Sequence, residues 1–406
     1  MLSFELVKLG TVCSLQNGFA FKSELFEESG FPILRISNIQ DNIIDTNKIV
    51  YTNIDSYKEN LTKYIVEKDD LLIAMSGATT GKVGFNTTDT KFLLNQRVGK
   101  FIPKSTLSKQ YLFYFLSTQV EKNLRISAGA AQPNLSSEQI KNMEIPLPPL
   151  PVQKAIVAKL DAAFASIEQA IAAAERNADN AKQLFQSYLS DVFERGGEGW
   201  VEKKLGDVCG FFNGYAFKSN DVIRNSDTQL LRMGNLYGNR LSLDRSPVFY
   251  PDKFQQTYSQ YLISKGDIVM SLTGTVGKRD YGYAVMIEQI STQLLLNQRI
   301  AKIQNLNENL ITKEFLLFYL RSEKFLDMLF KSANGTRQAN LSTTTMKSLP
   351  IPLCSIVEQR TLLDKIGEID TRTRDITIIA EKKRSLLEAL KQSLLNQAFN
   401  GQLVDA

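Results

Sequence analysis

Two long stretches of the chain carry apolar residues at alternating steps of three and four. The first stretch runs from Val152 to Phe193 and contains neither proline nor glycine. Its apolar positions are Leu160, Phe164, Ile167, Ile171, Ala174, Ala178, Ala181, Phe185, Tyr188 and Val192. Such steps keep side chains on one face of an α-helix, so we predict a single helix here, roughly 60 Å long.

The second stretch runs from Val357 to Phe399. Its apolar stripe, or seam, is Ile366, Ile369, Thr373, Ile376, Ala380, Leu387, Leu390 and Leu394. An apolar seam on an isolated helix would face water, so the two helices are expected to pack on each other as an antiparallel pair. Eleven large seam residues are candidates for this spacer contact or for contact with a partner protein: Leu160, Phe164, Ile167, Ile171, Phe185, Ile366, Ile369, Ile376, Leu387, Leu390 and Leu394.

The segments before the two helices are copies of each other. KLGTVCSLQNGFAFKS at Lys8–Ser23 and KLGDVCGFFNGYAFKS at Lys204–Ser219 agree at eleven of sixteen positions. A period of about half the chain indicates two domains, because solenoid repeats recur every ~20–50 residues. We expect a first domain at residues 1–150, a first helix at 151–199, a second domain at 200–355 and a second helix at 356–406.

Within each domain, short apolar runs alternate with polar loops and one amphipathic helix. Such a pattern predicts a compact α+β or mixed α/β fold, used twice and related by a pseudo-two-fold. Further matches between the copies are Arg35 with Arg232, Asn38 with Asn235, Gly81-Lys82 with Gly277-Lys278, Asn95-Gln96-Arg97 with Asn297-Gln298-Arg299, and Gln132 with Gln338. Asn17-Gly18 and Asn213-Gly214 predict turns, since Asn-Gly tolerates positive φ.

Charge and composition narrow the possible functions. The net charge is +5, and residues 200–355 carry 19 basic and 13 acidic side chains, or +6, against 16 and 15, or +1, for residues 1–150. A basic domain favours a polyanionic partner. No basic head precedes an apolar run and no uncharged apolar stretch reaches ~18 residues, so we expect a cytoplasmic protein without membrane contact.

The residue types of the chain argue against a catalytic site and against a metal site. The chain has no histidine, and its three cysteines, Cys13, Cys209 and Cys354, lack CxxC spacing, so we expect buried thiols and no metal site. GATTGK at residues 77–82 has three residues between its glycines and valine after its lysine, which does not fit a phosphate-binding P-loop. We predict a reader or scaffold, with no catalytic residues and no cofactor.

The comparison of the copies suggests DNA contacts. Residues kept in both copies suit shared tasks such as phosphate contact, whereas residues that differ suit separate base readout. Candidates for phosphate or positioning contacts are Lys22, Arg35, Lys82, Arg97, Lys218, Arg232, Lys278 and Arg299, each of which could equally be a solvated surface residue. Gln96, Gln132, Gln298 and Gln338 could bond adenine through their carboxamides or make structural hydrogen bonds. The loops at 40–61, 86–92, 237–259 and 284–294 differ most and are better candidates for base readout.

These motifs together resemble one known family, the specificity subunits of type I DNA restriction-modification systems. The matching features are KLG-x-V-C with NG-x-AFKS, ILRISNI, LNQR, Q-x-NLS, and IPLPP before a long helix, most of them present in both halves. The resemblance implies two target recognition domains on an antiparallel helical spacer. It also implies a non-catalytic subunit that binds double-stranded DNA and two adenine methyltransferase subunits, to which two ATP-dependent motor-nuclease subunits can be added.

Three alternatives remain open from the sequence. The chain could be a two-headed DNA-binding repressor that acts alone, a nuclease or methyltransferase with an unrecognised site, or a coiled-coil scaffold that binds only protein. Complex formation with a methyltransferase, enzymatic turnover, and DNA binding would distinguish them.

Overall fold

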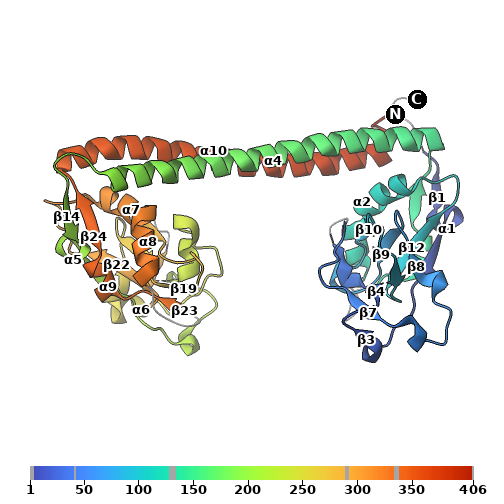
Figure 1. Cartoon of the computed structure of the whole chain (residues 1–406), viewed down its shortest axis with the longest axis horizontal. Helices are drawn as coiled ribbons and strands as arrows, with labels where there is room; N and C mark the ends of the chain where they lie inside the picture. Colours follow the sequence, from blue (N-terminus) through green and yellow to red (C-terminus); the bar gives the residue numbers. More distant parts are fainter. Residues whose placement is uncertain (1–3, 41–42, 128–133, 289–291, 333–337, 405–406) are drawn as a thin grey trace. The chain divides into compact units, whose positions relative to one another are not determined.

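The chain forms two compact units, which Figure 1 draws in the colours of the sequence. A computed structural model describes residues 4–40, 43–127, 134–288, 292–332 and 338–404. The first unit comprises Met1–Ala174 with Glu381–Ala406, and the second comprises Glu175–Ala380. Each unit therefore contains one copy of the repeat and one half of each long helix.

The first domain is built on two small sheets. A four-stranded sheet has the order β10-β9-β12-β2, and a five-stranded sheet has the order β3-β7-β4-β11-β8. These strands are β2 (Cys13–Asn17), β3 (Phe26–Glu27), β4 (Phe31–Leu34), β7 (Val50–Thr52), β8 (Ile65–Val66), β9 (Leu71–Ala74), β10 (Val83–Phe85), β11 (Phe92–Leu94) and β12 (Val98–Pro103). The remaining elements are β1 (Leu6–Lys8), α1 (Leu9–Val12), β5 (Ile39–Gln40), β6 (Ile43–Ile44), α2 (Lys109–Ser127), α3 (Ser137–Lys141) and β13 (Glu144–Pro146).

The second domain repeats this plan. Its four-stranded sheet has the order β15-β22-β18-β20, and a three-stranded sheet has the order β16-β21-β17. These strands are β15 (Gly210–Asn213), β16 (Thr228–Leu231), β17 (Leu262–Ile263), β18 (Ile268–Ser271), β20 (Ala284–Met286), β21 (Gln293–Leu296) and β22 (Ile300–Gln304). The other elements are β14 (Val201–Lys204), α5 (Leu205–Val208), α6 (Phe254–Thr257), β19 (Thr273–Thr275), α7 (Lys313–Arg321), α8 (Glu323–Ser332), β23 (Gln338–Asn340), α9 (Thr343–Ser348) and β24 (Pro350–Leu353).

Equivalent strands of the two domains have the same register. In the first domain Leu72 of β9 lies opposite Lys100 of β12, and in the second Val269 of β18 lies opposite Lys302 of β22. The central strands are fully buried, as their continuous apolar runs predict. The predicted mixed α/β fold, present twice, is confirmed.

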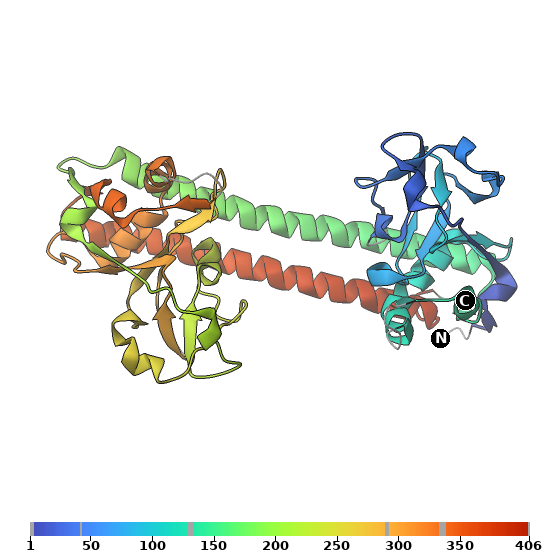
Figure 2. The ribbon, with the colours of Figure 1, turned by 90° about the horizontal axis from the view of Figure 1, so that it is seen from below.

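The two long helices are α4 (Leu150–Arg195) and α10 (Ile356–Phe399), within two residues of the predicted apolar stretches 152–193 and 357–399. They end before the expected segment bounds at 199 and 406. In the first unit the Lys391 ammonium lies 3.2 Å from the Glu168 carboxylate, and the Lys159 ammonium donates to the Leu403 carbonyl. In the second unit Thr373 donates to the Ala181 carbonyl at 3.4 Å. Within each unit the helices are therefore antiparallel neighbours, as expected, and Figure 2 shows them side by side from below.

The predicted seam is correct for α4 and partly wrong for α10. Ile366 is fully buried, but Ile376 and Leu390 are 38% and 45% exposed. Thr377, one position beyond Ile376, is only 5% exposed and takes its place. The apolar pattern favoured Ile376 over its neighbour, whereas Thr377 is buried and its hydroxyl donates to the Thr373 carbonyl at 2.9 Å.

A buried glutamine ties each domain to the helix that follows it. Gln153 in α4 accepts a hydrogen bond from the Ser108 backbone N–H and donates to the Thr106 and Pro148 carbonyls at 2.8–2.9 Å. Gln359 in α10 makes the equivalent bonds to Thr312, Leu310 and Cys354. Both side chains are fully buried. A lone glutamine inside a helical pattern carries no periodic signal, so hydrophobic spacing does not reveal these two residues.

The three cysteines are free and buried, as expected. Burial raises the pKa of Cys13 and Cys354 to about 11 and that of Cys209 to about 12. Thiols with such high pKa values are largely protonated near neutral pH, which suits apolar packing and not reactivity.

Candidate nucleic-acid interface

Two parallel strands end side by side in each domain. In the first domain Leu34 of β4 lies opposite Leu94 of β11, and in the second Leu231 of β16 lies opposite Leu296 of β21. Parallel strands share one edge for their carboxyl ends, so the residues that follow them come together. We call each set the carboxyl edge: Arg35, Asn95, Gln96 and Arg97 in the first domain, and Arg232, Asn297, Gln298 and Arg299 in the second.

The backbone of the Asn-Gln-Arg segment is held firmly at this edge. In the second domain the Arg299 N–H donates to the Asn297 side chain at 3.0 Å, and the Arg299 carbonyl accepts from the Leu272 N–H at 2.8 Å. Arg97 makes the same two bonds with Asn95 and Met75. Both arginines are exposed, and within the described ranges neither guanidinium bonds to another side chain. A fixed backbone with a projecting guanidinium suits an anionic partner.

The Asn-Gly motif packs directly against this segment. Phe19 forms a parallel bridge with Asn95, and Tyr215 forms one with Asn297. A Cβ atom on Gly18 would lie 2.2 Å from the Leu94 and Asn95 carbonyl oxygens. Neither Gly18 nor Gly214 has positive φ, so the predicted positive-φ turn is wrong. Glycine stands here because the two backbones touch.

The Q-x-NLS motif joins the same edge beside the glycine-bearing loop. The Leu135 N–H donates to the Met75 carbonyl and the Leu341 N–H to the Leu272 carbonyl, both at 2.8 Å. Asn134 forms an antiparallel bridge with Ser76, and β23 pairs with β19. The motifs shared by the two copies therefore converge on the carboxyl edge in each domain.

The predicted match of Lys82 with Lys278 is wrong. The Ala74 N–H donates to the Lys82 carbonyl, and the equivalent Ser271 N–H donates to the carbonyl of Tyr283. Gly81 and Gly282 correspond likewise, with φ of 84° and 78°. The loop of the second domain is four residues longer, so the sequence match Gly-Lys fell on residues in different structural positions. Lys278 lies exposed in the additional part of the loop.

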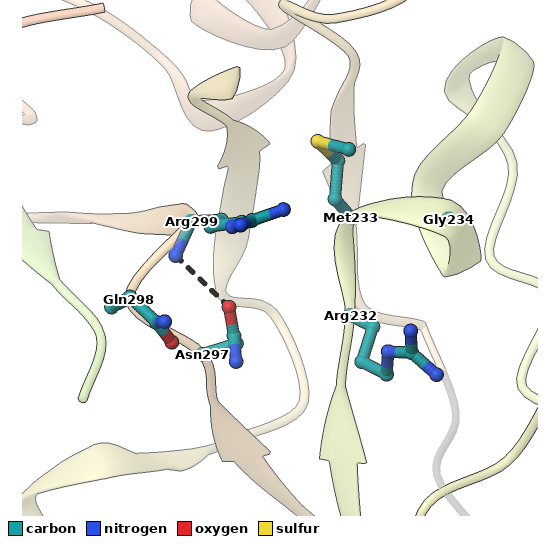
Figure 3. A pocket seen from close by; sticks show the side chains of 6 residues that line it. All are labelled: Arg232, Met233, Gly234, Asn297, Gln298 and Arg299. Carbon is teal, nitrogen blue, oxygen red and sulfur yellow. Dashed lines mark hydrogen bonds between the residues drawn. The ribbon is translucent and has the colours of Figure 1, made fainter. Parts of the chain in front are cut away.

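A pocket of about 320 Å³ opens at the carboxyl edge of the second domain. It is lined by Arg232, Met233, Gly234, Asn297, Gln298 and Arg299. Figure 3 shows Arg299 extended toward Met233, whereas Arg232 points away from it. Arg232 is steadied by a hydrogen bond of 3.4 Å from its guanidinium to the Ser246 carbonyl. The site thus offers two cations and two carboxamides on a fixed backbone.

The first domain leaves two buried polar atoms at this edge without a bond. Arg35 Nε and Ser76 Oγ have no hydrogen-bond partner among the residues that the structure describes. An unpaired buried polar group costs about 1–3 kcal/mol, so both atoms favour a ligand that bonds them. In the second domain Thr273, at the position of Ser76, donates to Met233 Sδ at 3.1 Å.

A buried asparagine organises the divergent loop that follows each edge. The Asn38 amide donates to the Asp45 carbonyl at 3.0 Å and the Lys48 carbonyl at 3.4 Å. The Asn235 amide donates to the Ser242 and Arg245 carbonyls. In both domains the two acceptors lie seven and ten residues after the asparagine. The loops therefore share their anchor and differ in the side chains that they expose.

The other predicted contacts are less well connected to the edge. Lys22 and Lys218 are exposed and precede the short 3-10 helices Ser23–Leu25 and Ser219–Asp221. Gln96 and Gln298 lie exposed within the edge itself. Gln338 belongs to β23, while Gln132 lies outside the described residues.

Two lysines shared by the copies are structural, although their repetition in the sequence resembles that of the edge arginines. The Lys100 ammonium lies 3.3 Å from the Asp70 carboxylate, and Lys302 lies 3.5 Å from Asp267. All four side chains are less than a quarter exposed. Conservation between the copies is therefore not by itself a sign of DNA contact.

In the described part of the chain, histidine, cysteine, aspartate and glutamate side chains nowhere gather in threes as metal ligands. The helices found there include none with the length and apolar character needed to cross a membrane.

Known proteins resemble the chain over nearly its whole length. It is 26% identical over 354 residues to the type I restriction enzyme MjaVIII specificity subunit of Methanocaldococcus jannaschii, covering 84% of this chain and 80% of that one. It is 23% identical over 429 residues to the EcoBI specificity subunit of Escherichia coli, covering 98% and 85%.

Solved structures share the fold. The HsdS subunit of Thermoanaerobacter tengcongensis matches with 17% identity and a TM-score of 0.54, over 98% of this chain and 97% of that one. A chain from a study of complex assembly in a type I R-M system matches with a TM-score of 0.72 and 18% identity, over 98% of both. The model of the type I restriction modification DNA specificity domain matches residues 1–175 and again 197–388. The chain therefore belongs to the type I restriction modification DNA specificity family.

Proposed function

We propose that this chain is the DNA-recognition subunit of a type I restriction-modification complex and reads a two-part target, one part with each domain. The observation that carries this proposal is the convergence of the repeated motifs on the carboxyl edge of each domain. Arg97 and Arg299 project there from a backbone that is fixed in the same way. The family to which the chain belongs supports the same function.

The two edges suggest that shared residues contact phosphates and divergent residues contact bases. Arg35, Arg97, Arg232 and Arg299 occupy the same place in both domains and suit phosphates, which every DNA sequence presents. Lys22 and Lys218 suit the same task at the flank. The loops anchored by Asn38 and Asn235 differ in sequence and suit base edges in the groove. Lys278, which has no counterpart in the first domain, belongs with these variable contacts.

Helix α10 offers a surface for protein partners. In the second unit Ile376, Ile378 and Ile379 are 38%, 56% and 63% exposed, and in the first unit Leu386 and Leu390 are 61% and 45% exposed. Exposed apolar stripes on a helix are typical of interaction sites. Ile376 and Leu390, which leave the predicted seam, thus suit contact with a partner.

We infer that the partners are two adenine methyltransferase subunits, to which two ATP-dependent motor-nuclease subunits can be added. The chain itself is then non-catalytic, and S-adenosylmethionine belongs to the methyltransferase. Relatives that are named as specificity subunits of restriction enzymes support this assignment. A cytoplasmic location follows from such partners.

Adenine methylation tests the proposal. Cells that contain the methyltransferase are compared with and without this chain, and methylated adenines are mapped by single-molecule sequencing. We expect a two-part sequence to be methylated only when the chain is present. Identical methylation without the chain would contradict the proposal.

Purified protein distinguishes the alternatives. Failure to co-elute with the methyltransferase would favour a repressor that acts alone. Loss of DNA binding at every salt concentration would favour a protein scaffold. Turnover of DNA by the chain with metal and S-adenosylmethionine would contradict the non-catalytic assignment.

The continuous helices suggest a spacer between the two reading domains. Four residues added in register to both α4 and α10 should lengthen each helix by about 6 Å, close to two base pairs at ~3.4 Å each. We expect the gap between the two parts of the target to grow while the parts themselves stay the same. An unchanged gap in the methylation map would contradict the spacer role.

A further inference from the structure

The two domains present different side-chain pairs at one shared place. Asn38 and Asn235 anchor their loops with equivalent bonds, so position 40 in the first domain corresponds to position 237 in the second. The backbone bonds of β9 and β18 place Lys82 where Tyr283 stands. Gln40 and Lys82 are therefore the counterparts of Tyr237 and Tyr283.

In the first domain this pair is polar. The Lys82 ammonium lies 3.3 Å from Gln40 Oε1, and the Gln40 amide nitrogen donates to the Ser37 carbonyl at 3.0 Å. Both the oxygen and the nitrogen of the Gln40 carboxamide are therefore hydrogen-bonded, and this fixes the position of the Lys82 ammonium. Both side chains are partly exposed.

In the second domain the pair is aromatic. The rings of Tyr237 and Tyr283 are 5.2 Å apart between centroids, and the Arg245 guanidinium lies 5.3 Å from the centre of the Tyr237 ring. Tyr283 is half-buried, and burial next to the Tyr237 hydroxyl raises its pKa to about 12. Tyr237 is 57% exposed, so its ring is available to a ligand.

Both pairs adjoin the carboxyl edge. In the first domain the Ala74 N–H bonds the Lys82 carbonyl, and the next residue, Met75, bonds the Arg97 carbonyl through its own N–H. In the second domain Ser271 and Leu272 connect Tyr283 and Arg299 in the same way. Each pair therefore flanks the strand end that also holds a proposed phosphate contact.

We propose that positions 40 and 82, and positions 237 and 283, form a pair that determines base preference at one position in each part of the target. This rests on the proposed function. The ammonium of Lys82 suits the N7 and O6 acceptors of guanine, whereas the Tyr237 ring suits the methyl group of thymine. The shared arginines set the distance to the duplex, and the pair reads the base that this distance brings within reach.

Exchange of the pairs tests the inference. The chain with Tyr237→Gln and Tyr283→Lys, and separately the chain with Gln40→Tyr and Lys82→Tyr, are produced with the methyltransferase, and methylated adenines are mapped. Each exchange should change the preference at one base position by about tenfold or more. The change should fall in one part of the target for the first variant and in the other part for the second.

Two further variants keep the test decisive. Tyr237→Ala removes a largely exposed ring and should relax the same base position without loss of folding, which the fluorescence of Trp200 and circular dichroism check. Val201→Gln, a change on the exposed strand β14, should leave the target unaltered. If the wild-type chain directs two-part methylation but every pair variant retains its base preference, the inference is overturned while the proposed function stands. Absence of methylation with the wild-type chain would instead contradict the proposed function.

Discussion

The two domains share a scaffold and differ in the loop between their equivalent strands β9–β10 and β18–β20. Eight residues, Met75 to Lys82, connect the strands in the first domain, whereas twelve, Leu272 to Tyr283, do so in the second. Asp280 holds the longer loop by accepting bonds from the Thr275 N–H at 2.8 Å and its hydroxyl at 2.7 Å. The extra residues leave the strand register unchanged, so a domain of this kind can vary its surface without altering its core.

The longer loop is supported by a helix break that the first domain lacks. Helix α2 is continuous over 19 residues, but its counterpart divides into α7 and α8 at Ser322. The Ser322 hydroxyl accepts from the Phe325 N–H and so caps α8. Tyr281 and Arg279 of the loop pack on this separate helix. The second domain therefore has both a longer loop before β20 and a separate helix α8 on which that loop packs.

The largest effect is expected from Tyr281→Ala. Tyr281 is 4% exposed, and its ring lies 4.9 Å from that of Phe330, edge to face. Removing such a buried ring should lower the free energy of unfolding of the second unit by about 3–5 kcal/mol. The sole tryptophan, Trp200, lies in that unit, so urea unfolding followed by its fluorescence measures the loss.

Val276→Ala, in the exposed part of the same loop, is the matched control and should change stability by less than about 0.5 kcal/mol. A loss below about 1 kcal/mol for Tyr281→Ala would show that the loop does not depend on its contact with α8.

The two buried glutamines test whether the scaffolds are equivalent. Gln153→Ala and Gln359→Ala each leave one backbone N–H and two carbonyls without their bonds. Unpaired buried groups cost about 1–3 kcal/mol each, partly relieved by water, so each variant should lose about 3 kcal/mol.

For Gln359→Ala, the urea midpoint measured by Trp200 fluorescence should fall. The Trp200 indole N–H donates to Glu358, the residue before Gln359, so this fluorescence reports on the same region. Loss of stability in Gln153→Ala should be seen by hydrogen exchange in the first unit. Gln392→Ala, an exposed position in α10, is the control. A difference of more than about 2 kcal/mol between the two glutamine variants would contradict equivalence.

The elements of the fold were largely predictable, because they follow from periodicity. Steps of three and four gave both long helices, and continuous apolar runs gave the buried strands β9 and β18. The side that an α10 residue faces was harder to predict. Ile376 is more apolar than Thr377, yet Thr377 is the buried residue, with its hydroxyl bonded to the Thr373 carbonyl one turn earlier.

The carboxyl edge was partly predictable. Repetition identified Arg97 and Arg299 but could not tell them from Lys100 and Lys302, which bond aspartates. Sequence similarity also matched Lys82 with Lys278, because an insertion in a loop is invisible without the strand register. Comparison of the copies does not reveal the pair of Gln40 and Lys82, because the equivalent positions in the second domain are two tyrosines.

The arginines of the edge test the shared part of DNA binding. Arg97→Ala and Arg299→Ala each remove an exposed guanidinium from an equivalent backbone position. If both contact phosphate, each should weaken DNA binding by about tenfold and reduce the dependence of log K on log salt by about one. Fluorescence anisotropy with target and unrelated duplexes measures both quantities. A loss confined to the target duplex would indicate base readout and contradict the phosphate role.

The smallest effect is expected from Arg279→Gln. The Arg279 guanidinium pairs with Glu323 and Asp327 and lies 5.2 Å from the centre of the Phe330 ring, but all three charged side chains are about half exposed. Exposed ion pairs contribute at most about 1 kcal/mol and are screened by salt. We therefore expect a loss of up to about 1 kcal/mol in Trp200-detected unfolding at low salt that shrinks in 1 M salt, whereas Arg224→Gln should change nothing. A larger loss that persists at high salt would mean that the cation's contact with Phe330, and not charge pairing with α8, holds the longer loop in place.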